Sequence, residues 1–374
     1  MKDLIVFGED WGAHPSSTQH LVKLLSEQRK VLWVNSIGLR RPRVNMSDLR
    51  RLIIKFRALL NTSVTNTSSP QALPVQVIQP KAIPLPGNRL ARILNRILLS
   101  RSIKPSIIRK NIKNPILWIS LPTAVDMVGE LNESAVIYYC GDDFGALEGV
   151  DHGPVLMLEQ ELATRADLIL VASPIIGKKF NQEKTHVIPH GVDFELFSRQ
   201  IPRAPELIVN RPVAGFYGSL ASWLDIDLIC DTAKRLPNWT FLMIGTVSTN
   251  ISRLQATSNI ILLGPRNHTE LASYSQYWNA SLLPFRNTNQ IKACNPLKLR
   301  EYLAAGSPVI STEFPALDGY RDLISVVRTA DEFAGALVSS LDDKNENRNA
   351  RQERVQGESW ASRAQTVAKL IDSL

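Results

Sequence analysis

The chain has 374 residues, of which 44% are hydrophobic and 21% charged, with a formal net charge of +8 at pH 7. This is the composition of a soluble globular protein long enough for two domains. Its three scattered cysteines exclude a disulfide framework and a cysteine-based metal site. No apolar run approaches the ~20 residues that span a bilayer, and the apolar start is too short for a signal peptide, so we expect a cytoplasmic protein.

The positive charge is concentrated in one segment. Between Leu39 and Asn114 there are sixteen Lys and Arg residues and a single acid, Asp48, so the rest of the chain is net acidic. In segments 40–60 and 88–113 arginines alternate with aliphatic residues, a pattern typical of basic amphipathic helices on an anionic membrane surface. Solvated helix faces and a nucleic-acid surface are the alternatives, and the scarcity of aromatic residues argues against nucleic acid as a partner.

The first half of the chain alternates strand and helix patterns, which indicates a parallel α/β sheet. Strands are predicted at 4–7, 31–34, 75–78, 115–119, 135–139, 168–172 and 186–188, with helices at 17–28 and 156–165. The glycine-containing loop after the first strand lies where open parallel sheets bind ligands. It is not G-x-G-x-x-G, and no G-x-x-x-x-G-K-[ST] occurs, which disfavours NAD-linked and P-loop chemistry.

Two aspartates, Asp142 and Asp143, follow the strand predicted at 135–139. At that position they could cap a helix, bind a metal or act as a base, and turn chemistry is the favoured interpretation. A second Asp-x-Asp pair, Asp225 and Asp227, opens a predicted helix over 225–235. We interpret that pair as a helix start, where acids favour the dipole, and not as a metal site.

A hinge is predicted at 197–212, where three prolines interrupt any periodicity. A second alternating series follows, with strands at 213–217, 240–244, 260–263, 280–283 and 308–311. Residues 332–353 form a charged helical tail, and a last helix begins at Glu358.

The segment from Asn295 to Ser311 predicts a short capped helix followed by a buried strand. Asn295 is the expected N-cap and Pro296 the first helical residue. Lys298 lies in the first turn, where a cation opposes the helix dipole unless an anion binds there. Glu301 lies one turn later on the same face. An ordinary capped connection explains the local pattern equally well.

Three segments together resemble the group 1 glycosyltransferases, most closely the subset that assembles surface polysaccharides such as teichuronic acid. Val187-Ile188-Pro189-His190-Gly191-Val192-Asp193 resembles their I-P-N-G-V-D signature, with His190 in place of Asn. Residues 301–310 resemble their E-A-x-A-x-G-x-P-V segment, and residues 215–220 resemble the entry to their second domain.

The resemblance implies a GT-B fold, in which two Rossmann-like, doubly wound α/β domains face a cleft and the C-terminal helix crosses back to the first domain. The implied domains are 1–196, completed by 358–374, and 213–357, with the hinge at 197–212. The implied activity is transfer of a sugar from a UDP- or GDP-sugar to a lipid-linked acceptor in cell-surface polysaccharide synthesis. Retention, no metal and no cofactor are the family expectation, and the basic segments predict a peripheral location on the inner face of the cytoplasmic membrane.

The resemblance also assigns roles to individual residues. In the second domain the implied donor-binding residues are Gly218, Ser219, Arg266, Asn295, Pro296, Leu297, Lys298 and Glu301. His190 and the acceptor-side loop with Gly8, Asp10, Trp11 and His14 border the implied reacting centre.

This sequence departs from the family pattern at two further positions. Ala293 replaces a second glutamate and Ser219 replaces an arginine, so the leaving-group cation is expected from Lys298, Lys292 or Arg286. An inverting, glucuronosyltransferase-like reaction would need a base, for which Asp142 or Asp143 is the candidate. A nucleotide-sugar 2-epimerase and a non-catalytic binding protein are the remaining alternatives.

Overall fold

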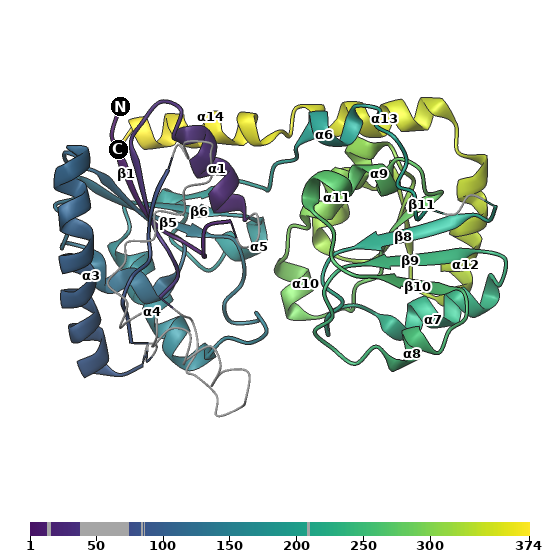
Figure 1. The fold of residues 1–374 in the computed structure, drawn as a ribbon, viewed down its shortest axis with the longest axis horizontal. Coiled ribbons are helices and arrows are strands. Elements are labelled where there is room, and N and C mark those ends of the chain that lie inside the picture. Colours follow the sequence, from purple (N-terminus) through teal and green to yellow (C-terminus); the bar gives the residue numbers. More distant parts are fainter. Residues whose placement is uncertain (13–15, 38–74, 84, 86, 208–209) are drawn as a thin grey trace. The chain divides into compact units, whose positions relative to one another are not determined.

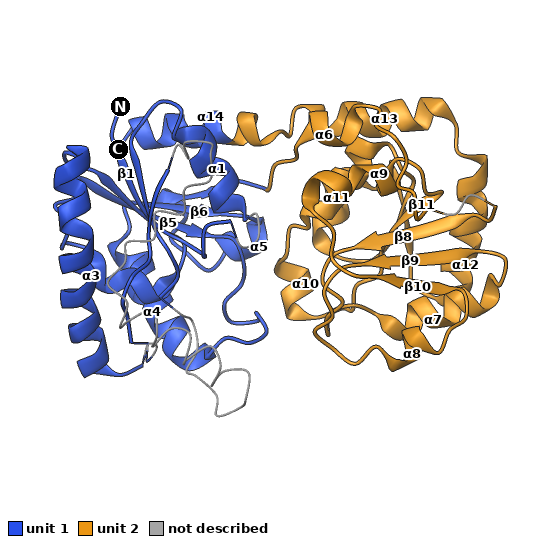
Figure 2. Ribbon diagram, viewed as in Figure 1, with its two compact units in different colours: residues 1–189, 364–374 blue, residues 190–363 orange. Residues whose placement is uncertain are grey.

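The computed structural model describes residues 1–12, 16–37, 75–83, 85, 87–207 and 210–374. The chain divides into two compact units, residues 1–189 with 364–374, and residues 190–363 (Figure 2). Each unit is a parallel sheet with helices, so the predicted pair of doubly wound α/β domains is confirmed (Figure 1). His14 and the basic segment 40–60 lie outside the described residues.

The first unit contains a seven-stranded sheet of order β3-β2-β1-β4-β5-β6-β7. Its central strands are short and entirely apolar because helices cover parallel sheets on both faces. In β1, Val6 pairs with Trp33 on one side and Trp118 on the other, and all three are fully buried. The elements are β1 Leu4–Phe7, α1 Ser17–Leu25, β2 Val31–Val34, β3 Gln76–Ile78, α3 Arg89–Lys110, β4 Ile116–Ile119, η1 Pro122–Met127, β5 Ala135–Cys140, α4 His152–Arg165, β6 Leu168–Val171, α5 Pro174–Gly177, η2 Gln182–Lys184 and β7 Thr185–Val187.

The second unit contains a six-stranded sheet of order β10-β9-β8-β11-β12-β13. The strand order reverses between β8 and β11, and ligands of open α/β sheets bind beside such a switch point. The elements up to the site helix are α6 Phe194–Ser198, β8 Val213–Tyr217, α7 Ile226–Arg235, β9 Thr240–Ile244, α8 Ser252–Gln255, β10 Ile260–Leu263, η3 His268–Glu270, α9 Ala272–Ser275, β11 Ala280–Leu283, α10 Asn289–Ala293 and α11 Leu297–Ala305. Those that follow are β12 Val309–Thr312, η4 Pro315–Tyr320, β13 Ile324–Val327, α12 Ala330–Ser339, η5 Ser340–Asp342, α13 Asn345–Gln356 and α14 Trp360–Asp372.

The expected hinge does not separate the two units. They divide between Pro189 and His190, and residues 197–207 pack on the second unit. Phe197 is fully buried in its core, and the Ala204 N–H donates to the Ser273 carbonyl. The prolines therefore shape a chain that lies against the second sheet. The last helix does span the division, since residues 364–374 belong to the first unit.

The C-terminal part contains one strand that the sequence did not predict. The expected helical tail 332–353 consists of α12 and α13, separated at η5, and Arg351 in α13 donates to both carboxylate oxygens of Asp343. The strand β13 was missed because its residues 324–327 are short and largely half-exposed, without a clear alternation.

Gly215 makes the centre of the second sheet possible. A Cβ at this position would lie 1.6 Å from Cε3 of Trp278, whose indole N–H donates to Ser281 and cannot easily move. We therefore expect Gly215→Ala to destabilise the second unit by about 1–3 kcal/mol through overpacking. Gly335→Ala is the matched control, because a Cβ at that exposed position in α12 would meet open space. The higher helix propensity of alanine should stabilise the second unit there by about 0.5–1 kcal/mol. Thermal unfolding measures both, and equal melting temperatures would contradict the packing argument.

Candidate functional site

The helix α11 begins at the predicted place but is not capped as predicted. Its N-cap is Pro296, with no side-chain cap, and Leu297 is its first residue. The Asn295 carboxamide oxygen instead accepts a hydrogen bond from the Arg300 guanidinium. The predicted Asn295 cap is therefore wrong, because a long cationic side chain competes for the same oxygen. No side-chain cap in the described structure thus covers the first turn of α11, where helices bind anions.

Lys298 lies in that first turn, against the loop that follows β8. Gly218 in this loop has φ +138°, and a Cβ there would lie 2.2 Å from the Lys298 Cε atom. Only a glycine lets the lysine pass so close to the backbone. Among the described residues no hydrogen bond or ion pair to the Lys298 amine is found; its Nζ lies 6.0 Å from the centroid of the Phe216 ring. Burial lowers the pKa of Lys298, although the charge of Glu301 acts in the opposite direction.

Glu301 is the most deeply buried acid of this site, with a relative exposure of 2%. One of its carboxylate oxygens lies 2.6 Å from Nε2 of His268, which begins η3 after β10. Burial would lower the pKa of His268, but the hydrogen bond and charge of Glu301, with the charge of Asp193, raise it. The imidazole therefore supplies a hydrogen bond and, when protonated, a positive charge to the buried carboxylate, which would be costly to bury alone.

Two buried tyrosines tie α11 to the sheet. The Tyr217 backbone N–H at the end of β8 donates to the hydroxyl of Tyr302, at 3.1 Å. Burial, followed by the charge of Glu301, raises the pKa of the Tyr217 hydroxyl, and burial also raises that of Tyr302. At the other end of the helix, Arg351 donates twice to the Gly306 carbonyl. The helix is thus held at both ends, with Lys298 and Glu301 on one face.

The other residues predicted in the second unit are less closely grouped. The Ser219 hydroxyl accepts a long hydrogen bond of 3.4 Å from Thr246, in the loop after β9. Arg266 pairs with Glu206 at 3.2 Å and contacts the Tyr274 hydroxyl. The His190 ring centroid lies 6.3 Å from that of Trp360 at the start of α14. Of the three expected leaving-group cations, Lys298 lies in the first turn of α11 beside Gly218, whereas Arg286 lies 3.7 Å from Asp227.

In the first unit, the loop after β1 is held by hydrogen bonds to the residues that follow β2. Gly8 is required because a Cβ would lie 2.4 Å from the Trp33 ring. Asp10 accepts hydrogen bonds from the Ser36 N–H and hydroxyl, and the Trp11 N–H donates to Asn35. These predicted acceptor-side residues are therefore a preformed loop at the carboxyl end of the sheet.

Asp142 and Asp143 have different surroundings after β5. Asp143 accepts from the Gly145 N–H, the predicted turn chemistry, and from Lys179 at 2.9 Å. Lys179 also reaches the buried Glu159 at 2.9 Å. Asp142 presents surface to water, yet neighbouring protein atoms crowd its carboxylate. This desolvation, followed by the charges of Glu9 and Asp143, raises the pKa of Asp142 to about 6.

The sequence did not identify His268, Lys179 or Glu9 as parts of these sites. Each acts across at least twenty residues of chain, so no local spacing could reveal it. Asp225, in contrast, caps α7 through the Leu228 N–H as predicted. Over the described ranges no cluster of three or more His, Cys, Asp or Glu side chains is arranged to hold a metal ion.

Residues 211–343, which contain β8 to α12 and the whole α11 site, match the model of the glycosyl transferases group 1 family. This segment is a group 1 glycosyl transferase domain. The chain is also 30% identical over 222 residues to TuaH of Bacillus subtilis, named as a teichuronic acid biosynthesis glycosyltransferase. That match covers 54% of this chain and 56% of TuaH, so the chain spans about half the length of this relative.

Solved structures that match the whole length of this chain confirm the GT-B fold. Sucrose-phosphate synthase from Thermosynechococcus elongatus has a TM-score of 0.72 at 15% identity, covering 100% of this chain and 99% of its own. Anabaena HepE in complex with UDP and glucose has a TM-score of 0.68 at 13% identity, covering 100% of both chains. A trehalose-6-phosphate structure from E. coli bound with UDP-2-fluoro glucose also scores 0.68 at 13% identity, covering 100% of this chain and 99% of its own.

The His268–Glu301 pair predicts a pH dependence of stability. A histidine whose folded pKa is raised stabilises fully below its unfolded pKa, about 6.5, and the contribution is lost as pH rises through the folded pKa. The melting temperature of the wild type minus that of His268→Gln should therefore be largest at pH 6 and decrease toward pH 9.

The control for this series is His186→Gln, since His186 is exposed on β7 in the other unit. Its melting-temperature difference should stay constant over the same range. A difference for His268→Gln that does not vary with pH would show that the imidazole is not charged in the folded protein.

Proposed function

We propose that this protein is a glycosyltransferase that moves a sugar from a nucleoside-diphosphate sugar to an acceptor hydroxyl. The bond from the anomeric carbon to the diphosphate oxygen breaks, a bond from that carbon to the acceptor oxygen forms, and the acceptor loses its proton. The observation that carries the proposal is α11, which places Lys298 and Glu301 one turn apart beside a helix start that no described side chain caps. The group 1 domain and the structural relatives described with UDP support a nucleotide-sugar donor.

The physical role of Lys298 follows from its surroundings. The Lys298 amine is half-buried, its pKa is lowered by burial, and it forms no ion pair with any of the described residues. A donor diphosphate would supply that charge, and the Leu297 and Lys298 N–H groups would add hydrogen bonds. We propose that this cation and helix start stabilise the leaving diphosphate without a metal or other cofactor. Glu301 would accept hydrogen bonds from the donor ribose while His268 holds its other side.

We further propose that the acceptor is a lipid-linked glycan of a cell-surface polysaccharide, reached at the inner face of the cytoplasmic membrane. The name of TuaH supports polysaccharide synthesis, and the basic segment of the first unit supports work at a membrane surface. Of the helices in the described ranges, none is both long and apolar enough to cross a bilayer.

Calorimetric titration with UDP tests the donor site. Lys298→Met should weaken UDP binding at least tenfold, because a charge-assisted hydrogen bond contributes about 1.5–3 kcal/mol. Glu301→Ala should likewise remove sugar transfer while a folded protein remains. Lys234→Met, which changes an exposed lysine in the last turn of α7, is the matched control and should bind UDP as the wild type does.

Two results would contradict this assignment. UDP affinity unchanged in Lys298→Met would remove the lysine from the diphosphate site, and transfer undiminished in Glu301→Ala would remove the ribose contact. Conversion of the donor to an epimer without any acceptor would favour the epimerase, and no turnover of any donor would favour a binding protein.

Retention of anomeric configuration is our proposal, and inversion is the second candidate, favoured by Asp142. With a pKa of about 6, an Asp142 carboxylate would be poised to act as a general base near neutral pH. A retaining reaction predicts that Asp142→Asn loses less than about tenfold in kcat. An inverting reaction predicts a loss of about 10²–10⁴, with kcat/KM of the wild type rising through pH 6.

The control here is Asp143→Asn, since Asp143 is engaged by Lys179. The charge of Asp143 raises the pKa of Asp142, so its removal should lower that pKa. If kcat/KM rises near pH 6 in the wild type, the rise should therefore move to lower pH in Asp143→Asn without loss of activity. NMR of the freshly formed product, which distinguishes the two anomers, decides between the candidates: an inverted linkage would overturn our proposal of retention.

A further inference from the structure

The outer face of α3 exposes a cluster of large aliphatic side chains in its first two turns and one more near its end. Over 22 residues, or about 33 Å, the helix buries Ala91, Asn95, Leu99 and Ile103 against its own unit. Its opposite side exposes apolar residues at spacings of three or four, which share one helix face. They are Leu90 at 78% exposure, Ile93 at 50%, Leu94 at 45%, Ile97 at 40% and Ile108 at 79%.

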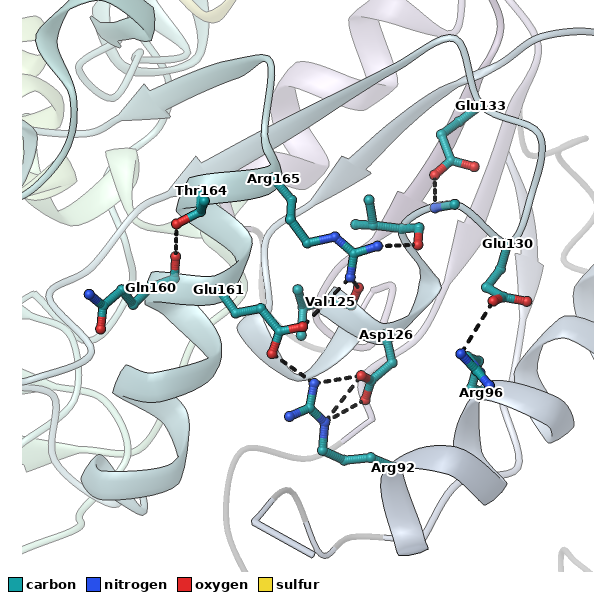
Figure 3. Close-up of polar contacts among 12 residues, drawn as sticks. Arg92, Arg96, Val125, Asp126, Glu130, Glu133, Gln160, Glu161, Thr164 and Arg165 are labelled. Atoms are coloured by element: carbon teal, nitrogen blue, oxygen red, sulfur yellow. Dashed lines mark hydrogen bonds and ion pairs between the residues drawn. The ribbon is translucent and has the colours of Figure 1, made fainter. Parts of the chain in front are cut away.

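The charges of α3 sort into two groups. Arg92 donates to Asp126 at 2.6 Å and to Glu161 at 2.8 Å, and Arg96 lies 3.7 Å from Glu130 (Figure 3). These two arginines attach the helix to η1 and α4, so their charges are already balanced. Arg101 and Lys104, in contrast, are exposed between Ile97 and Ile108.

We propose that the α3 face, defined as Leu90, Ile93, Leu94, Ile97, Arg101, Lys104 and Ile108, docks on an anionic lipid bilayer. The helix carries seven basic residues and no acid, and the sequence has no Asp or Glu between Asp48 and Asp126. Aliphatic side chains that enter the headgroup boundary beside exposed cations match an anionic bilayer, because the cations stay at the phosphates while the aliphatic groups leave water.

The charge of the face decides among its possible occupants. A second copy of α3 would bring like charges together, and residues 49–60, with four basic residues and no acid, would do the same. A bilayer presents many anionic groups around an apolar interior and satisfies both parts of the face. The inference deepens the proposed function, since it names the surface by which a membrane-side transferase would meet a lipid-linked acceptor.

Vesicle flotation tests the docking. The full-length wild type should float with vesicles of 30% phosphatidylglycerol in phosphatidylcholine and fail to float with phosphatidylcholine alone. Ile93→Glu/Ile97→Glu should weaken binding at least tenfold, and Arg101→Glu/Lys104→Glu should do so by about fivefold or more per charge. Val338→Glu/Leu341→Glu is the matched control, because those exposed apolar residues lie in the second unit.

Flotation that the Ile93/Ile97 variant retains in full, or that phosphatidylcholine alone supports equally, would overturn the proposal. A wild type that never floats would do the same. UDP affinity distinguishes this failure from failure of the donor site: the α3 variants should bind UDP normally, and Lys298→Met should float normally.

A label at Ile93 tests what covers the face. In Ile93→Cys carrying an environment-sensitive fluorophore, emission should shift to the blue only when anionic vesicles are added. Emission already shifted in buffer would show that another part of this chain or a second copy covers the face, and would contradict lipid docking. Light scattering in buffer separates those two occupants.

Discussion

The contact between the buried carboxylate of Glu301 and the imidazole of His268 is the constraint on which the second unit's site depends. A carboxylate with 2% exposure requires a cationic or hydrogen-bonding partner, and the partner comes from η3, 33 residues earlier in the chain. The pair therefore holds the loop after β10 against α11. Tyr302 joins the same helix to the end of β8, so α11 supports both the loop after β8 and the loop after β10.

Much of this fold could be predicted from the chain itself. The strands from β1 to β12 in the described ranges were expected within one or two residues, because short apolar runs bounded by turn residues, such as Ile116–Ile119, are typical of buried strands. The placement of Lys298 and Glu301 on one face of α11 also followed from their spacing alone. The edge strand β13 did not, because its half-exposed residues carry no such pattern.

The parts that sequence could not predict are contacts between distant side chains. Asn295 has the residue type of a good helix cap, yet its carboxamide oxygen accepts a hydrogen bond from the Arg300 guanidinium, whose Nε donates to Glu358. Pro296 is the N-cap of α11 instead. Likewise, Asp143 accepts a hydrogen bond from Lys179, which is 36 residues away in the chain. The pKa of Asp142 is instead raised by desolvation and by the charges of Glu9 and Asp143. The residue types in the sequence indicate which side chains could take these roles, and the contacts made in the folded protein determine which of them do.

The central claim is that α11 holds a nucleotide through Lys298 and Glu301, and a crystal structure of the protein soaked with UDP tests it most directly. The account predicts diphosphate oxygens within hydrogen-bond distance of the Lys298 amine and the Leu297 and Lys298 N–H groups, with a ribose hydroxyl on Glu301. UDP bound away from α11, with the Lys298 amine still without an anion, would contradict it.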